Sequence, residues 1–137
     1  MGRCSVTTRP QQLVCRFETV TGRVEVLNTT EFEAWFMTLD EKATQAVIAR
    51  VDLLAEEGPA LRRPVIGEIK GSAFDPQMKE LVCSSSLRVL FIFDPARQAV
   101  LLVGGDKAGN WKGWYRQAIP AADELYRVYL RETGQEA

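Results

Sequence analysis

The stretch LRVLFIF, from Leu87 to Phe93, is the clearest strand signal in the chain and decides its fold class. Its branched and aromatic side chains favour an extended, largely buried conformation. Met78 to Cys83 reads as a second strand before it, across a turn of three serines. Ala99 to Val103, rich in valine and leucine, reads as a third strand after the tight turn at Asp94 to Arg97. Short connections are typical of antiparallel neighbours, so the pattern predicts a three-stranded antiparallel meander.

The segment before the meander predicts a pair of helices. Thr30 and Thr38 each precede a glutamate by three residues, which is the capping-box pattern that begins a helix. We therefore expect a short helix after Thr30 and a second helix from about Asp40 to Glu57. Gly58-Pro59 is expected to end the second helix, because glycine favours a helix cap and proline cannot continue the helix.

The segment after the meander predicts a loop and a closing helix. Gly104-Gly105 is expected to end the third strand, and Lys107 to Tyr115 reads as a polar loop or helical turn. Ile119-Pro120 is expected to begin the final helix, because proline is well tolerated in a first turn. The inner face of this helix is expected to hold Ala121, Leu125, Val128 and Tyr129.

These elements predict one α+β domain in a chain of 137 residues. Residues 24–137 are expected to form an antiparallel β-meander with an N-terminal helix pair packed on it and a C-terminal helix. Residues 1–23 are expected to be an N-terminal extension. Leu13, Cys15 and Phe17 alternate there, so the extension is either an additional strand or a loose tail.

Composition limits the chemistry and the location of the protein. The chain has no histidine, so an acid–base mechanism must use lysine, arginine, tyrosine, carboxyl or thiol groups. Its three cysteines, Cys4, Cys15 and Cys83, fit neither a disulfide framework nor a zinc site, and we expect no metal and no cofactor. No apolar run approaches the ~20 residues of a membrane helix, and no signal peptide is evident at the start. We therefore expect a cytoplasmic protein without a membrane partner.

Charge is unevenly spread along the chain, although the formal net charge is only −1. From Val24 to Glu57, eight acidic residues face two basic ones. From Arg62 to Arg116, nine basic residues face five acidic ones. A basic half beside an acidic half suggests a surface for a polyanion on one side of the molecule, although chance asymmetry between two solvated faces gives the same count.

Arg88 is the first candidate site residue, because an arginine within an apolar strand is costly unless its charge is used or paired. Strand alternation places Arg88 on one face with Leu90 and Ile92. It reads either as a phosphate clamp, since guanidinium is a planar bidentate donor, or as a structural partner of Glu80. Lys79 and Glu80 point to opposite faces, and the register decides which of them lies beside Arg88. The alternative is that each is simply a solvated charge on a strand.

A second candidate cluster follows the meander, from Gly104 to Arg116. It holds three basic side chains that suit phosphates and three aromatic rings that suit unstacked bases: Lys107, Lys112, Arg116, Trp111, Trp114 and Tyr115. The alternative is a turn whose aromatic side chains plug the end of the sheet, with one of the two tryptophans in the core. No phosphate-loop signature is present in this stretch.

Val24 to Glu132 resembles the RelE/HigB toxins of type II toxin–antitoxin systems, in particular the phage Gp49-like branch of the RelE/ParE superfamily. Four stretches carry the resemblance in order: the helix pair from Glu31 to Pro59, the segment IKG…MKEL, LRVLFIFD, and LLVGGDKAGNWKGWYRQAIPAADELY. The resemblance implies a RelE-like fold and a ribosome-dependent endoribonuclease that cleaves mRNA without a metal. It also implies neutralisation by a helix-turn-helix antitoxin.

The resemblance further implies roles for individual residues. In such toxins the 2′-hydroxyl of the substrate attacks the adjacent phosphate, and basic side chains stabilise the developing charge. Lys70 and Lys79 match basic residues near the scissile region, Arg88 the phosphate-holding arginine, and Lys107 the basic residue past the last strand. Tyr115 is the candidate acid or base, and basic neighbours are expected to lower the pKa of a tyrosine or lysine among them. The alternative base is Glu80 or Asp106.

Two other functions fit the same fold. One is a ParE-like inhibitor of DNA gyrase, and the other is a non-catalytic binding protein derived from a phage. The fold alone does not choose among them. The joint presence of Lys79, Arg88, Lys107 and Tyr115 favours the nuclease, with mRNA, the ribosome and an antitoxin as partners.

Overall fold

A mixed β-sheet forms the centre of the computed structural model, which describes residues 4–6, 14–20 and 22–136. Within these residues the sheet has seven strands in the order β1-β2-β3-β7-β6-β5-β4. Strands β3 and β7 are parallel and the other neighbours are antiparallel. The bounds are β1 Cys4–Val6, β2 Val14–Phe17, β3 Val26–Thr29, β4 Ile66–Glu68, β5 Lys79–Val82, β6 Leu87–Phe93 and β7 Ala99–Asp106. The predicted meander is confirmed as β5, β6 and β7.

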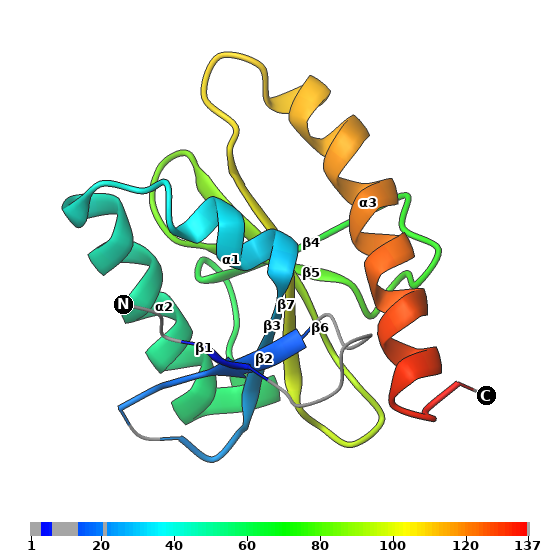
Figure 1. The fold of residues 1–137 in the computed structure, drawn as a ribbon. Coiled ribbons are helices and arrows are strands. Elements are labelled where there is room, and N and C mark those ends of the chain that lie inside the picture. Colours follow the sequence, from blue (N-terminus) through cyan, green and yellow to red (C-terminus); the bar gives the residue numbers. More distant parts are fainter. Residues whose placement is uncertain (1–3, 7–13, 21, 137) are drawn as a thin grey trace.

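Helices cover both faces of the sheet. Helices α1 (Thr30–Phe36) and α2 (Glu41–Glu57) lie on one side, and α3 (Trp111–Glu132) lies on the other (Figure 1). A short 3-10 turn, Gly58–Ala60, follows α2. The α+β class, with an N-terminal helix pair and a C-terminal helix on a meander, is confirmed, and the architecture is consistent with a RelE-like fold.

Strand β6 divides the two cores. Val89 and Phe91 face the helix pair and belong to one buried cluster. Leu90 and Ile92 face α3 and belong to the other. All four side chains are at most 1% exposed. The strict alternation predicted for LRVLFIF is therefore confirmed, and Arg88 shares the α3 face with Leu90.

The helix pair follows the prediction except at its N-caps, because neither Thr30 nor Thr38 caps a helix. Asp40 caps α2, and its side chain accepts the N–H of Ala43 at 2.8 Å. Thr29, and not Thr30, caps α1, because Thr29 accepts the N–H of Phe32. The Thr29 hydroxyl also donates to the carbonyl of Leu102 at 2.6 Å. This bond fixes Thr29 at the end of β3, so the helix begins one residue earlier than predicted.

The closing helix was predicted to begin too late. Helix α3 begins at Trp111, capped by the Asn110 side chain, which accepts the N–H of Gly113. Pro120 is therefore inside the helix. Proline disfavours a helix interior because it lacks an N–H and crowds the preceding turn. For this reason the sequence predicted that the helix begins at Ile119-Pro120 and not before it. The predicted inner face of α3 is confirmed at Tyr129, which is buried, and at Leu125, which packs against the core, but Ala121 is exposed. The buried residues of α3 are Ala118, Ala122, Asp123, Tyr126 and Tyr129.

The third meander strand is longer than predicted. Gly104 and Gly105 do not end it, because they continue β7 and pair with Val89 and Arg88 of β6. The N-terminal extension contributes β1 and β2, which pair with each other, while β2 also pairs with β3. Leu13 lies outside the described residues.

One cysteine differs from the expectation that the three cysteines form no disulfide framework. Cys15 is disulfide-bonded, whereas Cys83 is a free, buried thiol. Burial raises the pKa of the Cys83 thiol to about 12, against the opposing charges of Arg50 and Arg88. Among the described residues, no helix combines the length and apolar character needed to cross a membrane.

Candidate active site

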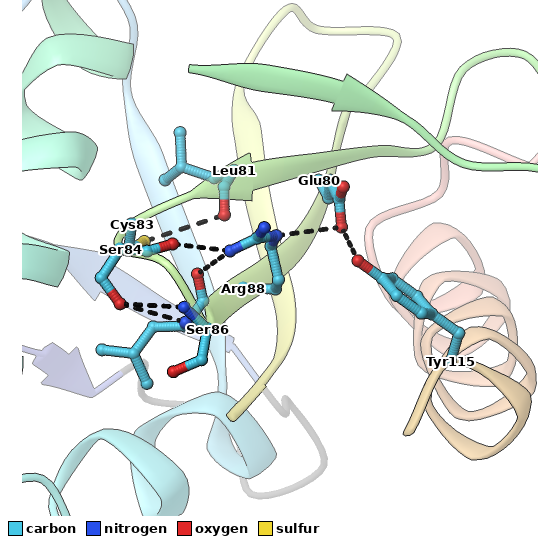
Figure 2. Close-up of polar contacts among 8 residues, drawn as sticks. Glu80, Leu81, Cys83, Ser84, Ser86, Arg88 and Tyr115 are labelled. Carbon is cyan, nitrogen blue, oxygen red and sulfur yellow. Dashed lines mark hydrogen bonds and ion pairs between the residues drawn. The ribbon is translucent and has the colours of Figure 1, made fainter. Parts of the chain in front are cut away.

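Arg88 lies at the centre of the candidate site, on the face of β6 that α3 covers. Its side chain is only 11% exposed. Nη1 donates to the carbonyl of Ser84 at 2.7 Å and to its neighbour Leu87 at 3.1 Å (Figure 2). The serine turn between β5 and β6 therefore holds the guanidinium in place. Ser84 was not predicted as a site residue, and the turn-forming serines were its only signal in the sequence.

Glu80 joins Arg88 to Tyr115. The register pairs Glu80 with Leu90, which puts the carboxylate on the same face as Arg88. Glu80 Oε1 lies 3.7 Å from Arg88 Nε and accepts a hydrogen bond from the Tyr115 hydroxyl at 2.5 Å (Figure 2). The three side chains come from β5, β6 and α3, so the site forms only when the C-terminal helix packs on the sheet.

The guanidinium of Arg88 has a hydrogen-bond donor that no group in the described part of the chain satisfies. Its Nε is buried and has no hydrogen-bond partner among the described residues. An arginine offers five N–H donors, and an unsatisfied buried donor costs free energy. The contact with Glu80 is an ion pair without a formed hydrogen bond. Arg88 is therefore a structural partner of Glu80, and it also has a donor that no described protein group satisfies, as a phosphate clamp requires.

The pKa of Tyr115 is raised well above its ordinary value. Burial is the largest cause, followed by the hydrogen bond to Glu80 and the charge of Glu80, while Arg88 opposes them. The basic neighbour Arg88 does lower this pKa, as expected, but burial and Glu80 outweigh it, so the net shift is upward. Tyr115 therefore keeps its proton at neutral pH and acts as a donor.

Aromatic and basic side chains form the rim above this cluster. Trp111 is 53% exposed, and the Nζ atoms of Lys107 and Lys112 lie 5.6 Å and 5.9 Å from its ring centroid. Trp114 instead packs against the α3-side core, with its ring 4.9 Å from that of Tyr115. The expectation of one packed tryptophan is confirmed. An exposed ring flanked by two lysines is suited to stack on a base while the lysines hold phosphates.

An open groove of about 500 Å³ connects the rim to the cluster. Most of the predicted site residues line it: Lys70, Glu80, Trp111, Lys112, Tyr115 and Arg116. They come from segments far apart in the sequence, and α3 supplies four of them. The arrangement can grip a polyanion, stack one base and place a carboxylate and a phenol together.

Five candidate residues do not line the groove: Lys79, Arg88, Asp106, Lys107 and Trp114. Lys79 pairs with Phe91 in the sheet and lines a different cavity, on the face of the helix pair. Asp106 is exposed at the end of β7, and its carboxylate accepts the N–H of Ala108. Glu80 is therefore the carboxylate that the fold brings to Arg88. Within the described residues, no three histidine, cysteine or acidic side chains are grouped to hold a metal ion.

Comparison with known proteins gives a consistent family. Residues 34–127 match the family described as phage derived protein Gp49-like (DUF891). The chain is 51% identical over 106 residues to "Putative toxin HigB3" of Mycobacterium tuberculosis (strain ATCC 25618 / H37Rv), which covers 77% of this chain and 92% of that relative. It is 44% identical over 103 residues to "Putative toxin HigB2" of the same strain, covering 72% of this chain and 51% of that relative. The chain thus spans about half the length of HigB2.

Proposed function

This chain belongs to the phage-derived Gp49-like family and is a homologue of HigB-type toxins, and from that premise we propose that it is a ribosome-dependent mRNA endonuclease. The observation that carries the proposal is the cluster of Arg88, Glu80 and Tyr115, in which Glu80 and Tyr115 line a groove with basic and aromatic walls and Arg88 lies behind Glu80. The groove supplies what single-stranded RNA requires, and the cluster supplies a phosphate donor, a carboxylate and a proton-bearing phenol.

In the proposed reaction, the 2′-hydroxyl of the substrate gives its proton to the Glu80 carboxylate, and its oxygen attacks the adjacent phosphorus. The bond from phosphorus to the 5′-oxygen of the next nucleotide breaks, and Tyr115 gives its proton to that oxygen. Glu80 then returns its proton to Tyr115 across their hydrogen bond. The products are a 2′,3′-cyclic phosphate and a 5′-hydroxyl, and the scheme uses no metal or cofactor.

Arg88 stabilises the charge that develops on the phosphate oxygens. Its fixed guanidinium is preorganised by the Ser84 carbonyl, which reduces the reorganisation needed during the reaction. Lys70, Lys112 and Arg116 line the groove and hold neighbouring phosphates, while Lys107 reaches the rim beside Trp111. Lys79 has no role in this scheme because it faces the other side of the sheet.

The remaining parts of the proposal come from the family. A toxin of this kind acts in the cytoplasm on the translating ribosome and is neutralised by a cognate helix-turn-helix antitoxin, whose gene we expect beside this one. We also propose that residues 24–137 carry the toxin activity and that residues 1–23 are an N-terminal extension, in which the described strands β1 and β2 add to the sheet.

The test uses the purified chain, translating ribosomes and a defined mRNA, with cut sites read by primer extension. We expect cuts that need the ribosome and that slow by at least about 100-fold in Arg88→Ala and in Glu80→Gln. Lys42→Ala, an exposed lysine on α2, is the matched control and should cut as the wild type does. Thermal melts establish that each variant is folded.

Three outcomes separate the possibilities. Loss of cutting in both site variants, with the control unaffected, supports the mechanism. Full cutting in Arg88→Ala and Glu80→Gln overturns the site. A folded wild type that cuts no mRNA overturns the nuclease function itself and leaves gyrase inhibition or a binding role to be tested.

A further inference from the structure

A second cavity lies on the opposite face of the sheet from the groove. It has a volume of about 550 Å³ and lies between the end of α2, the 3-10 turn and strands β4, β5 and β6. That volume falls in the range of roughly 300–1,000 Å³ typical of sites that bind a ligand or a side-chain anchor. Its apolar lining is formed by Leu54, Leu61, Ile66, Phe91 and Phe93.

The polar lining of this cavity is basic. Arg62, Arg63 and Lys79 line it together with one acidic residue, Glu68. Arg62 is held at the end of the 3-10 turn, where Nη1 donates to the carbonyl of Pro59 at 2.8 Å. Lys79 is half-buried and is paired in register with Glu68 of β4, yet within the described residues its side-chain ammonium forms no ion pair. A ligand carboxylate that reaches this ammonium would add an ion pair that the chain itself does not form.

We propose that this cavity docks an acidic segment of the antitoxin, with one bulky apolar side chain on the cavity floor and carboxylates against Arg62, Arg63 and Lys79. The inference rests on the proposed function for the identity of the partner. The site itself rests on the cavity and on its charge. Arginine clusters beside an apolar depression are a recurring way to bind acidic peptide segments.

An RNA occupant fits this cavity less well than a protein segment. Recognition of single-stranded RNA uses exposed ring faces, and Phe91 is only 1% exposed here, whereas Trp111 in the groove is 53% exposed. The groove opens on the other face of the sheet, and the two sites share one lining residue, Glu68 of the edge strand β4. Docking in the cavity therefore uses side chains other than the basic and aromatic ones of the groove.

The test measures binding of the purified antitoxin to the full chain, and mRNA cutting by the same preparations. Arg63→Glu reverses an exposed charge at the cavity and should weaken antitoxin binding at least about tenfold while leaving mRNA cutting unchanged. Lys42→Glu makes the same type of change at an exposed lysine in the first turn of α2 and should change neither. Leu61→Trp adds bulk to the wall and should weaken binding by blocking the apolar anchor.

The outcomes distinguish this inference from the proposed function. A wild-type chain that binds the antitoxin through Arg63 but cuts no mRNA supports the docking site and overturns the nuclease. Unchanged antitoxin binding in folded Arg63→Glu overturns the docking site, whether or not the chain cuts mRNA. Loss of cutting in Arg63→Glu, with antitoxin binding intact, also overturns it and assigns the cavity to RNA.

Discussion

At the scale of single residues, Tyr115 links the candidate site to the stability of the fold. Burial and the hydrogen bond to Glu80 raise its pKa above the ordinary value of about 10. The native state therefore binds the phenolic proton more tightly than the unfolded chain does. This contribution to the free energy of unfolding is complete below about pH 10 and is lost as the pH rises through the raised native pKa.

The first prediction follows from the direction of this change in the free energy of unfolding with pH. In chemical denaturation at a series of pH values, the free energy of unfolding of the wild type should fall above about pH 10, and that of Tyr115→Phe should fall less. Tyr126 and Tyr129 also have raised pKa values, but they titrate in both proteins and cancel in the comparison. Identical alkaline slopes for the two proteins would show that Glu80 and burial do not hold the Tyr115 proton.

Arg88 shows why the candidate site was only partly predictable. Its apolar neighbours in LRVLFIF indicated that its charge must be used, and the structure gives it a nearly buried position. The choice between Lys79 and Glu80 as its neighbour depends on the β5–β6 register, which no local pattern specifies. The pKa of Tyr115 depends on the same register, because Glu80 is the group that raises it.

At the scale of elements, two consecutive glycines of β7 let a helix pack on each side of the sheet. A Cβ atom at Gly104 would lie 2.3 Å from the ring of Trp35 in α1. A Cβ atom at Gly105 would lie 2.0 Å from Trp114 Nε1 in α3. The glycine pair that suggested a strand end is therefore a site of close helix approach within a strand.

The second prediction uses these adjacent glycines as a matched pair. Gly104→Ala and Gly105→Ala should each reduce the free energy of unfolding by about 1–3 kcal/mol, because the added methyl group displaces a tryptophan. Only Gly105→Ala moves Trp114, whose ring lies 4.9 Å from Tyr115, so it should also slow mRNA cutting. The assay compares cutting at a temperature where both variants are folded. An equal loss of cutting in both would indicate general destabilisation and contradict this reading.

Helix α3 shows which elements local patterns predict poorly. The periodicity of α2 and the branched and aromatic composition of β6 were sufficient to place those elements, since α2 buries one regular face and β6 buries both of its faces. Pro120 was expected in the first turn of α3, yet Asn110 caps the helix much earlier and tertiary packing of Ala118 and Ala122 holds it. Tertiary contacts override local propensity in this segment, and they also carry Tyr115 to Glu80.

At the scale of the whole molecule, the acidic segment and the groove lie on different sides of the sheet. The acidic segment from Val24 to Glu57 forms β3, α1 and α2, and the two helices lie on the opposite side of the sheet from α3 (Figure 1). The basic residues of the groove come from the second half of the chain. The sheet thus separates the acidic helices from the groove, whereas three other basic residues, Arg62, Arg63 and Lys79, line the cavity beside the end of α2.

The third prediction concerns the salt dependence of RNA binding by the groove. Each phosphate contact with a single strand contributes a slope of about −0.7 to the logarithm of affinity against the logarithm of salt concentration. Five basic side chains line or border the site, namely Lys70, Arg88, Lys107, Lys112 and Arg116. With cutting suppressed by Glu80→Gln, titration of a single-stranded RNA should give a slope of about −2 to −3.5.

Adding Lys112→Ala to that background should make the slope less negative by about 0.7, since one phosphate contact is removed. Adding Lys42→Ala should leave the slope unchanged, because Lys42 is exposed in the acidic helix α2 on the other side of the sheet. Equal effects of the two substitutions would mean that RNA responds only to total charge. A change confined to Lys112→Ala would locate the RNA backbone in the groove between α3 and the meander, whose lining includes Glu80 and Tyr115.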